Sequence, residues 1–407
     1  MLTYILSKTF INVDVMGFKI GWLTWEQRKL GEVATFSKGT GYSKQDLESD
    51  GTPIILYGRM YTNYELVIHS VNTFTTAKEK SIYSNGGEVI VPASGETAED
   101  ISVASVVEQA NVLLGGDLNI IHTNKNVEPV FLALSITNGE PHKDMAKRAQ
   151  GKSVVHLHNS DLAQIKLSYP SKDEQKKIDS YFLKFDTLIA LQQRKLDQLN
   201  TLKKALLQKM FADKKHPQPE LRFKGFSGDW EQHKLGEVVT KLSKKEKSTE
   251  LLPAIEYEDV VPEDGILNKK LTDKSDKKVG TYFDEKSVLF GKLRPYLKNW
   301  LNPNFKGVAV GDWWVLEPNN LLNVNFLYWL IQTKYFMNIA NQTTGTKMPR
   351  SDWNLVSSTR FLIPTSKNEQ VNISRTLTNL QHLITLQQSK LDKLNSLKKS
   401  LLQNMFI

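Results

Sequence analysis

One segment of this chain occurs twice, and that repeat restricts the possible fold more than any other feature. Leu188–Phe211 matches Leu383–Phe406 at 18 of 24 positions, at a constant offset of 195. The six differences follow one another at steps of four or three residues, which is the spacing of one face of an α-helix. We therefore interpret the segment as a duplicated helix that keeps its packing faces and varies on an outward face.

The apolar period of both copies is typical of a supercoiled helix pair. Steps of four and three alternate over about four and a half heptads in each copy. Both copies carry polar residues at the same two seam positions, Gln192 and Lys203 in the first and Gln387 and Lys398 in the second. Polar seam residues penalise misaligned partners, so we expect the copies to pair with each other rather than to be two unrelated surface helices. The other predicted seam residues are Ile178, Phe182, Phe185, Ile189, Leu196, Leu199, Leu206 and Met210, then Ile373, Leu377, Leu380, Ile384, Leu391, Leu394, Leu401 and Met405.

A second repeat opens each half of the chain. Trp25–Val33 (WEQRKLGEV) returns as Trp230–Val238 (WEQHKLGEV), with eight of nine residues identical. The chain is thus a domain and a helix, followed by another domain and helix, and the differing interiors predict one scaffold with two recognition surfaces. The predicted boundaries are an N-terminal extension at 1–16, a first domain at 17–170, a first helix at 171–212, a connector at 213–218, a second domain at 219–365 and a second helix at 366–407.

The domain interiors indicate a mixed α+β class. Both contain short β-like runs separated by turn signals such as Asn85-Gly86-Gly87. Each domain ends at a proline that is soon followed by Glu-Gln, and acidic residues in the first turn of a helix complement its dipole. The expected strands are Pro53–Tyr57, Glu88–Val91, Ser287–Phe290, Gly307–Val310 and Trp313–Leu316, and the expected helices are one starting at Pro129–Ile136 and one over Val324–Ala340.

Composition places the chain among ordinary globular proteins. Hydrophobic residues make up 40% and charged residues 24%, which excludes a disordered chain. Cysteine is absent, so disulfides and thiolate metal sites are excluded, and a reducing cytoplasm suits the chain. No apolar run has the length of a membrane span, and the apolar residues 1–16 lack the basic leader of a signal peptide.

Positive charge concentrates on the two helices. Residues 171–215 carry a net +5 and residues 366–407 a net +4, which together equal the +9 of the whole chain. A cationic rod suits a protein that lies near a polyanion, although a solvated helix face has the same composition. If a pseudo-twofold axis relates the halves, the helices run antiparallel and carry one domain at each end. Helices of about 38 residues span roughly 57 Å, which would hold two DNA-reading domains at a fixed separation, as a molecular ruler.

Basic and aromatic residues alternate in loops that are the best candidates for DNA contacts. Arginine and lysine bind phosphates or guanine edges, asparagine pairs with adenine, and glycine lets the backbone approach a phosphate. The tryptophans Trp300, Trp313, Trp314 and Trp329 are expected in the core instead. The predicted DNA-binding residues are Lys38, Thr40, Tyr42, Lys44 and Arg59 in the first domain and Lys292, Arg294, Tyr296, Lys298, Asn299, Lys347 and Arg350 in the second.

Catalytic motifs are missing or incomplete. Gly151-Lys152-Ser153 imitates the end of a phosphate-binding loop, but the position of its first glycine is Ala146. His156 and His158 have no evident third metal ligand. No Asn/Asp-Pro-Pro-aromatic segment for amino methylation and no glycine-rich cofactor fingerprint is present. We therefore predict no catalytic residues, no metal site and no cofactor in this chain.

Taken together, these motifs resemble the DNA-specificity subunit of type I restriction-modification systems. The resemblance rests on the repeated WEQ-K-LGE opening, the step from proline to Glu-Gln into each long helix, and the helix ends LKKALLQKMF and LKKSLLQNMF. LFGKLRPYLKNW and GTKMPRSDW in the second domain also resemble one common type of target recognition domain. The match runs from about Gly17 onward.

The resemblance implies a fold, a function and partners. Two pseudo-symmetric target recognition domains would lie at opposite ends of an antiparallel coiled coil of conserved spacer helices. Each domain would read one half of a bipartite, asymmetric DNA site, and the helices would set the spacer. The partners would be double-stranded DNA, two methyltransferase subunits that use S-adenosylmethionine to methylate adenine, and restriction subunits that use ATP and Mg²⁺, in the nucleoid-associated cytoplasm of a prokaryote. A stand-alone bipartite DNA-binding regulator, or a methyltransferase or nuclease with an unrecognised motif, are the alternatives.

Overall fold

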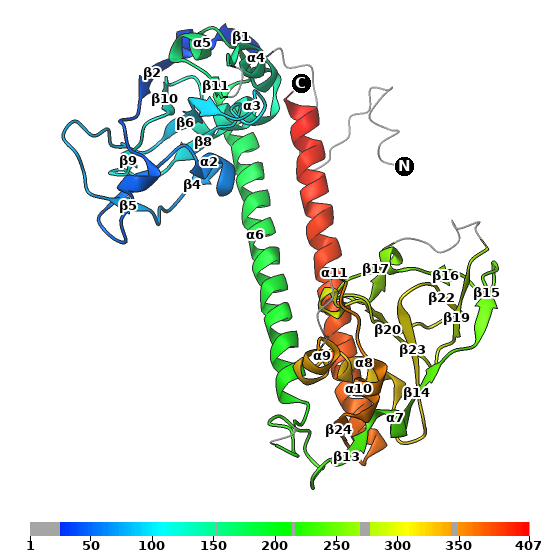
Figure 1. Cartoon of the computed structure of the whole chain (residues 1–407). Coiled ribbons are helices and arrows are strands. Elements are labelled where there is room, and N and C mark those ends of the chain that lie inside the picture. The colour runs from blue at the N-terminus through cyan, green and yellow to red at the C-terminus, as the bar shows by residue number, and fades with distance from the viewer. Residues whose placement is uncertain (1–24, 152–153, 214–215, 269–276, 343–347, 407) are drawn as a thin grey trace. The chain divides into compact units, whose positions relative to one another are not determined.

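The computed structural model describes residues 25–151, 154–213, 216–268, 277–342 and 348–406 (Figure 1). The chain divides into two compact units. Unit 1 takes in residues 1–190 and 392–407, and unit 2 takes in residues 191–391. Each unit therefore combines one domain with a segment of each long helix. The predicted extension at 1–16 lies outside the described residues.

Unit 1 is built around a five-stranded sheet. Its elements are β1 (Glu26–Lys29), α1 (Leu30–Val33), β2 (Ala34–Lys38), η1 (Lys44–Asp46), β3 (Thr52–Ile55), α2 (Arg59–Thr62), β4 (Val67–Ile68), β5 (Phe74–Thr75), β6 (Glu88–Pro92), β7 (Ser94–Gly95), β8 (Ser105–Val107), β9 (Leu113–Leu114), β10 (Leu118–Thr123), α3 (Pro129–Asn138), α4 (Glu140–Arg148), β11 (Val155–His156), α5 (Asn159–Ala163) and β12 (Lys166–Tyr169). The strand order is β2-β10-β6-β8-β4, with β4 parallel to β8 and the other neighbours antiparallel. Strand β6 is buried on both faces. Because successive strand residues point to opposite faces, Val89 and Val91 pack in the core with α3, and Ile90 packs in a second core with Ile55 of β3.

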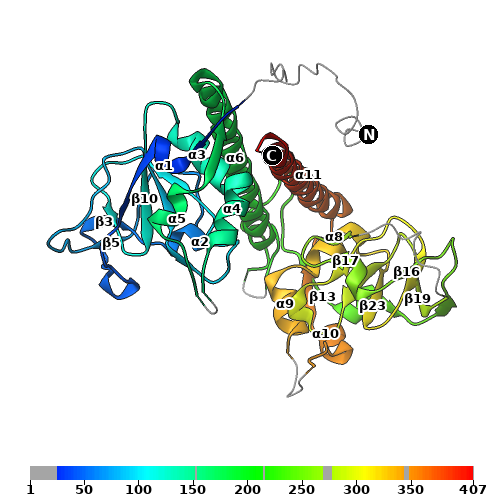
Figure 2. The same cartoon turned by 90° about the horizontal axis from the view of Figure 1, so that it is seen from above.

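Unit 2 is built around two four-stranded sheets. Its elements are β13 (Glu231–Lys234), α7 (Leu235–Val238), β14 (Val239–Leu242), β15 (Lys245–Lys247), β16 (Ala254–Ile255), η2 (Tyr257–Asp259), β17 (Val260–Val261), β18 (Ile266–Leu267), β19 (Val279–Phe283), β20 (Val288–Gly291), η4 (Pro295–Leu297), β21 (Trp300–Leu301), β22 (Gly307–Ala309), β23 (Trp313–Pro318), α8 (Val324–Leu330), α9 (Lys334–Ala340), α10 (Trp353–Ser358) and β24 (Arg360–Ile363). The strand orders are β14-β23-β20-β21 and β15-β19-β22-β16. Figure 2 shows α8, α9 and α10 grouped on one side of these sheets. On β20, Phe290 packs in the core with these helices, and Leu289 packs in the core with the second sheet.

Most of the expected elements are confirmed. The five expected strands overlap β3, β6, β20, β22 and β23, and the expected helix start at Pro129 is that of α3. The four tryptophans are buried, with exposed fractions of 1–5%. The single helix predicted over Val324–Ala340 is wrong. It divides into α8 and α9, because the hydroxyl of Thr333 accepts a hydrogen bond from the N–H of Phe336 and so caps a new helix.

The repeated opening and the end of each domain are joined by strand pairing. β1 pairs antiparallel with β12, and β13 pairs antiparallel with β24. A proline follows each exit strand, and a long helix then begins: α6 (Lys172–Lys209) after Pro170 and α11 (Lys367–Met405) after Pro364. The first and last strands of each domain are therefore hydrogen-bonded neighbours, although more than a hundred residues separate them in the sequence.

A buried glutamine fastens each long helix to its domain. Gln370 is fully buried; its amide nitrogen donates to the carbonyls of Pro364 at 2.8 Å and Leu321 at 3.0 Å, and its amide oxygen accepts from the N–H of Asn323 at 2.7 Å. Gln175 makes the corresponding three bonds in unit 1, at 2.9, 3.0 and 2.9 Å. In each repeated Glu-Gln pair, the glutamine therefore joins the start of the long helix to the backbone of its domain. The helix dipole accounts only for the acidic residue before it.

Replacing Gln370 by alanine should lower the free energy of unfolding by about 3 kcal/mol, because it leaves several buried backbone groups without a partner. Urea denaturation followed by tryptophan fluorescence measures the change. The matched control is Gln193→Ala, at an exposed position of α6. Equal stability of the two variants would show that the three bonds contribute nothing.

The long helices run antiparallel within each unit. In unit 1, Lys398 of α11 pairs with Asp186 of α6, and Phe406 lies against Phe182, so the numbering rises on one helix as it falls on the other. In unit 2, the amide of Gln387 donates to that of Gln192 at 2.7 Å, and Ile373 shares a core with Met210. All of the predicted seam residues are buried or half-buried. The expected fold class, α+β domains with an antiparallel coiled coil, is thereby confirmed, and no described helix is long and apolar enough to cross a bilayer.

The two seam lysines have different partners. Lys398 pairs with Asp186 across the helices of unit 1. In unit 2 the residue that corresponds to Asp186 is Gln381, whose amide donates to Asp264 in the β17–β18 hairpin at 3.4 Å. Lys203 in turn donates to the carbonyl of Glu263 in the same hairpin at 3.5 Å. Unit 2 thus uses an acidic hairpin of its domain where unit 1 uses a helix carboxylate.

Asp179 is a buried carboxyl on α6. Burial, reinforced by the charge of Glu128, raises the pKa of Asp179 to about 7. The corresponding residue of the second copy, Ser374, carries no charge. The pKa in the folded chain exceeds the value of about 3.9 in the unfolded chain. Asp179 therefore lowers the free energy of unfolding of the protein as the pH rises from about 4 to about 7.

We therefore expect Asp179→Asn to raise the melting temperature at pH 8 by roughly 5 °C and to leave it unchanged at pH 4. Calorimetry at the two pH values measures this difference. Asp197→Asn, at an exposed position of the same helix, is the control and should show no such pH dependence. An equal change in melting temperature at both pH values would contradict the raised pKa of Asp179.

Candidate nucleic-acid interface

Two distant segments of unit 2 form one surface. Strand β20 leads into the loop Lys292–Asn299, which lies beside Pro349–Ser351. The N–H of Arg294 donates to the carbonyl of Pro349 at 2.7 Å, and the N–H of Ser351 donates to the carbonyl of Lys292 at 2.8 Å. The sequence predicts both segments as DNA contacts, and the structure brings them together. Lys347 lies outside the described residues.

A single carboxylate organises the positive charge of this surface. Asp312 lies 3.5 Å from the ammonium of Lys292 and 3.2 Å from the guanidinium of Arg350. Burial acts to raise the pKa of Asp312, but the hydrogen bond and charge of Arg350 and the charge of Lys292 outweigh it, so the pKa lies below its usual value. Two cations share one anion, which leaves a net positive charge available to a phosphate.

The tip of the loop is a rigid turn. Arg294 and Lys298 both adopt left-handed backbone conformations, with φ of 47° and 57°, on either side of the 3-10 turn η4. For residues other than glycine this conformation costs about 1–2 kcal/mol each. Between them Tyr296 is 54% exposed and Leu297 is 42% exposed. The tip therefore presents two large side chains outward on a backbone with little freedom.

Contacts from beneath hold the loop in place. The hydroxyl of Tyr257 accepts from the N–H of Leu293 at 2.8 Å and lies 3.1 Å from the carbonyl of Asp312. Burial raises the pKa of Tyr257, so the phenol keeps its proton and can donate. A Cβ at Gly291 would lie 2.6 Å from this hydroxyl, so only glycine fits there. Of the predicted DNA contacts, Lys298 pairs with Glu263 at 2.6 Å, and Asn299 is only 5% exposed.

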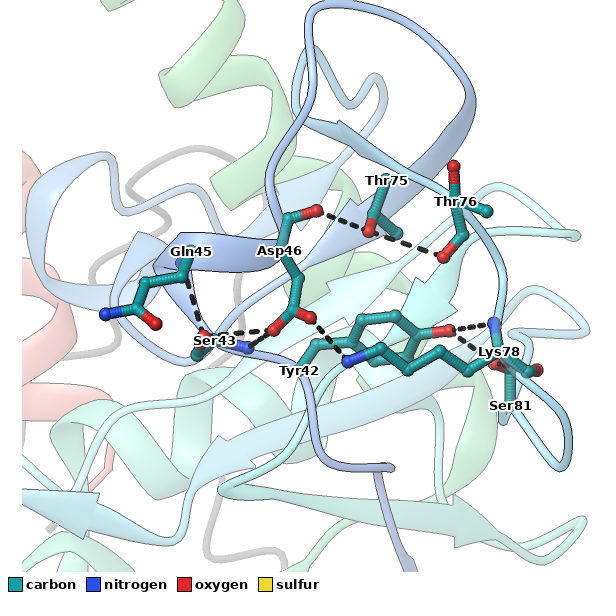
Figure 3. Close-up of polar contacts among 8 residues, drawn as sticks. All are labelled: Tyr42, Ser43, Gln45, Asp46, Thr75, Thr76, Lys78 and Ser81. Carbon is teal, nitrogen blue, oxygen red and sulfur yellow. Dashed lines mark hydrogen bonds and ion pairs between the residues drawn. The ribbon is translucent and has the colours of Figure 1, made fainter.

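In unit 1 four of the predicted residues lie at the end of β2 and on the turn that follows it. Lys38 and Lys44 are exposed and Thr40 is half-buried, but Tyr42 is only 8% exposed. The hydroxyl of Tyr42 accepts from the N–H of Lys78 at 2.7 Å and bonds to Ser81 (Figure 3). The structure therefore places this phenol as a support beneath the turn.

An ion pair closes the same turn. The ammonium of Lys78 lies 2.5 Å from a carboxylate oxygen of Asp46 and 4.6 Å from the centre of the Tyr42 ring (Figure 3). The hydrogen bond from Lys78, followed by those from Ser43, lowers the pKa of Asp46 to about 2. The turn is thereby fixed, with Lys44 at its exposed side.

Arg59 begins α2 and is close to this turn. A Cβ built at Gly58 would lie 4.0 Å from the Cε atom of Lys44, so the two basic segments are neighbours. The guanidinium of Arg59 bonds to Glu65 at 2.6 Å and to the carbonyl of Ser70 at 3.2 Å. Its charge is therefore partly offset, and within the described residues Lys38 and Lys44 are exposed cations without an ion-pair partner.

The sequence did not identify the residues that position these loops. Asp312, Glu263, Lys78 and Tyr257 are far along the chain from the residues that they contact, and none belongs to a motif. His156 bonds to the hydroxyl of Ser94 at 3.1 Å through Nδ1. Within the described ranges no group of three or more His, Asp or Glu residues could hold a metal ion.

Known proteins resemble this chain over most of its length. The family described as type I restriction modification DNA specificity domain matches residues 23–201 and 227–396. The type I restriction enzyme MjaVIII specificity subunit of Methanocaldococcus jannaschii is 23% identical over 405 residues, which cover 93% of this chain and 91% of that protein. The putative MjaX specificity subunit of the same organism is 25% identical over 195 residues, which cover 46% of this chain and 45% of that protein.

Solved structures share the fold. The S subunit of a type I restriction-modification system from M. genitalium superposes with a TM-score of 0.64 at 16% identity, covering 96% of this chain and 98% of that one. A chain from a study of complex assembly and conformational transition of the type I R-M system gives 0.53 at 15% identity, covering 96% and 99%. Since the family matches both halves, and each match spans a domain and most of the helix that follows it, this chain belongs to the family of type I restriction modification DNA specificity domains.

Proposed function

We propose that the chain is the DNA-binding specificity subunit of a type I restriction-modification complex. The observation that carries this proposal is the family match over both halves, each built on the same strand pairing and helix start but with a different loop surface. One domain would read each half of a bipartite, asymmetric DNA site, and the helices would set the spacer. Exposed lysines and arginines on the loops supply phosphate contacts, and base contacts would supply the specificity.

The family gives the chain a non-catalytic role, and we assign the chemistry to partner subunits. Methyltransferase subunits would bind S-adenosylmethionine and methylate adenine, and restriction subunits would use ATP and Mg²⁺. Such a complex would act in the cytoplasm of a prokaryote, on the DNA of the nucleoid. A stand-alone bipartite regulator would need none of these partners, and membership of this family does not favour it.

Exposed leucines on both long helices support a partner surface. Leu191 and Leu202 on α6 and Leu383 and Leu386 on α11 are 47–57% exposed in unit 2. Leu202 and Leu383 each immediately precede a seam residue, and in an antiparallel pair these flanking positions lie on the same side. Leu191 corresponds to Leu386 at the offset of 195, so both copies present the same apolar side. We assign this surface, the leucine flank, to the methyltransferase subunits, because a repeated surface suits two copies of one partner.

Coexpression of the chain with a methyltransferase subunit in cells without other adenine methylation tests the proposal. Methylation-sensitive long-read sequencing should then reveal one bipartite site, and neither subunit alone should give any methylation. Methylation by this chain with S-adenosylmethionine alone would make it an enzyme. Tight binding to a split site, with no methylation in any combination, would favour the regulator.

A further inference from the structure

The loop between β20 and β21 carries an unusual pair of side chains for a DNA-binding surface. Tyr296 and Leu297 are adjacent and exposed, at the outermost turn of a loop that otherwise consists of basic residues and buried anchors. A contact to phosphates alone would need only the cations Lys292 and Arg350. The exposed apolar pair has no role in the core, so its position requires a separate explanation.

The backbone presents this pair as a fixed projection. The N–H of Leu297 donates to the carbonyl of Arg294 at 2.8 Å, and the N–H of Lys298 donates to the carbonyl of Pro295 at 2.8 Å, which closes the turn on itself. The proline ring also fixes one φ angle. The base of the loop is clamped on both sides, by the bond from Arg294 to Pro349 and by the bond from the N–H of Glu263 to the carbonyl of Lys298 at 3.0 Å.

A stiff apolar projection between cations has a known use in DNA recognition. Side chains such as leucine enter between neighbouring base pairs, partly unstack them and bend the duplex, while flanking basic groups hold the phosphates. The cost depends on the flexibility of the base step, so specificity arises where no hydrogen bond is made. A mobile loop would insert less favourably, because ordering the loop would cost part of the binding free energy.

We propose that Tyr296 and Leu297 form a wedge that inserts into the base stack of the half-site read by unit 2, with Lys292 and Arg350 on the adjacent phosphates. This inference rests on the proposed function and adds a mode of readout to it. The wedge selects deformable base steps, and the sequence preference at its insertion point comes from stacking rather than from base edges.

The test uses the complete methyltransferase complex and the site that methylation mapping defines. Duplexes carrying 2-aminopurine at successive positions of each half-site report unstacking by increased fluorescence. Methyltransferases flip the target adenine out of the stack, so we expect an increase there and, with the unaltered complex, at one further step of the half-site read by unit 2. The double variant Tyr296→Ala, Leu297→Ala should lose the signal at this further step and bind on the order of tenfold more weakly, with an unchanged dependence on salt.

Two further variants separate the wedge from other roles. Lys292→Ala should keep the fluorescence signal and lower the salt slope by about 1. Leu321→Ala, at an exposed leucine elsewhere in unit 2, should behave like the unaltered complex. Absence of a fluorescence increase at any step other than the flipped target adenines, unchanged binding by the double variant, or its failure to assemble with the methyltransferase would overturn the wedge. If the unaltered complex bound no bipartite site at all, the proposed function itself would fail.

Discussion

Phe406→Ala is expected to destabilise unit 1 by about 3–5 kcal/mol, although Phe406 directly follows the helix that comes after the second domain. Its ring lies 6.3 Å from Trp25 and 5.6 Å from Phe131, measured between ring centres. Phe406 is 5% exposed and belongs to the main core of unit 1. Truncation would leave a cavity among large aromatic side chains, which is the most costly kind of core substitution.

The equivalent aromatic contact occurs in unit 2, with the roles of the two halves exchanged. In unit 2, Phe211 from the end of the first helix lies 6.4 Å from Trp230 and 5.1 Å from Phe326. Each domain core is therefore completed by the end of the helix from the other half. Phe211→Ala should accordingly destabilise unit 2 by a similar amount.

Hydrogen exchange followed by mass spectrometry distinguishes the two effects, because it reports local protection. In Phe406→Ala the peptides of β2, β10 and α3 should exchange faster, and those of β20 and β23 should not. Ser400→Ala, at an exposed position of the same helix, is the control. Faster exchange in unit 2 alone would show that the helix end stabilises its own half instead.

Leu191→Glu combined with Leu386→Glu is expected to abolish copurification with the methyltransferase subunit and the methylation that depends on it. Both leucines belong to the leucine flank, so the change leaves the seam residues of the helix pair intact. Burying a leucine contributes about 1.5–3 kcal/mol, and each 1.4 kcal/mol is a tenfold change in affinity, so losing two predicts at least a hundredfold loss. The introduced carboxylates would add a desolvation cost.

The control for this double variant is Leu321→Glu, which places the same charge at an exposed leucine outside the helices. Circular dichroism should show unchanged helix content in all variants. Normal copurification of the double variant would remove the leucine flank as the docking surface and leave the family assignment intact.

Local patterns predicted the helices well, and loop geometry poorly. The heptad seam needs only residues within a few turns of one another, so the sequence predicted that the two helices pair, and the structure then placed Gln387 against Gln192. The loop Lys292–Asn299 was recognised from its composition, but its shape depends on Tyr257, Asp312 and Pro349. Those partners come from other strands and loops, and no local pattern records which carboxylate meets which cation.

The sequence by itself determined that the chain is built twice on one plan, because identical residues at a constant offset require the same local structure. It also determined that Trp25, Trp230, Phe211 and Phe406 are significant, since each belongs to a repeat. Only the tertiary structure decided that Trp25 meets Phe406 and Trp230 meets Phe211. The physical reason is that the two helix ends are nearly identical in sequence, so local sequence cannot discriminate between the pairings. The antiparallel packing of the helices brings each end into the core of the other half.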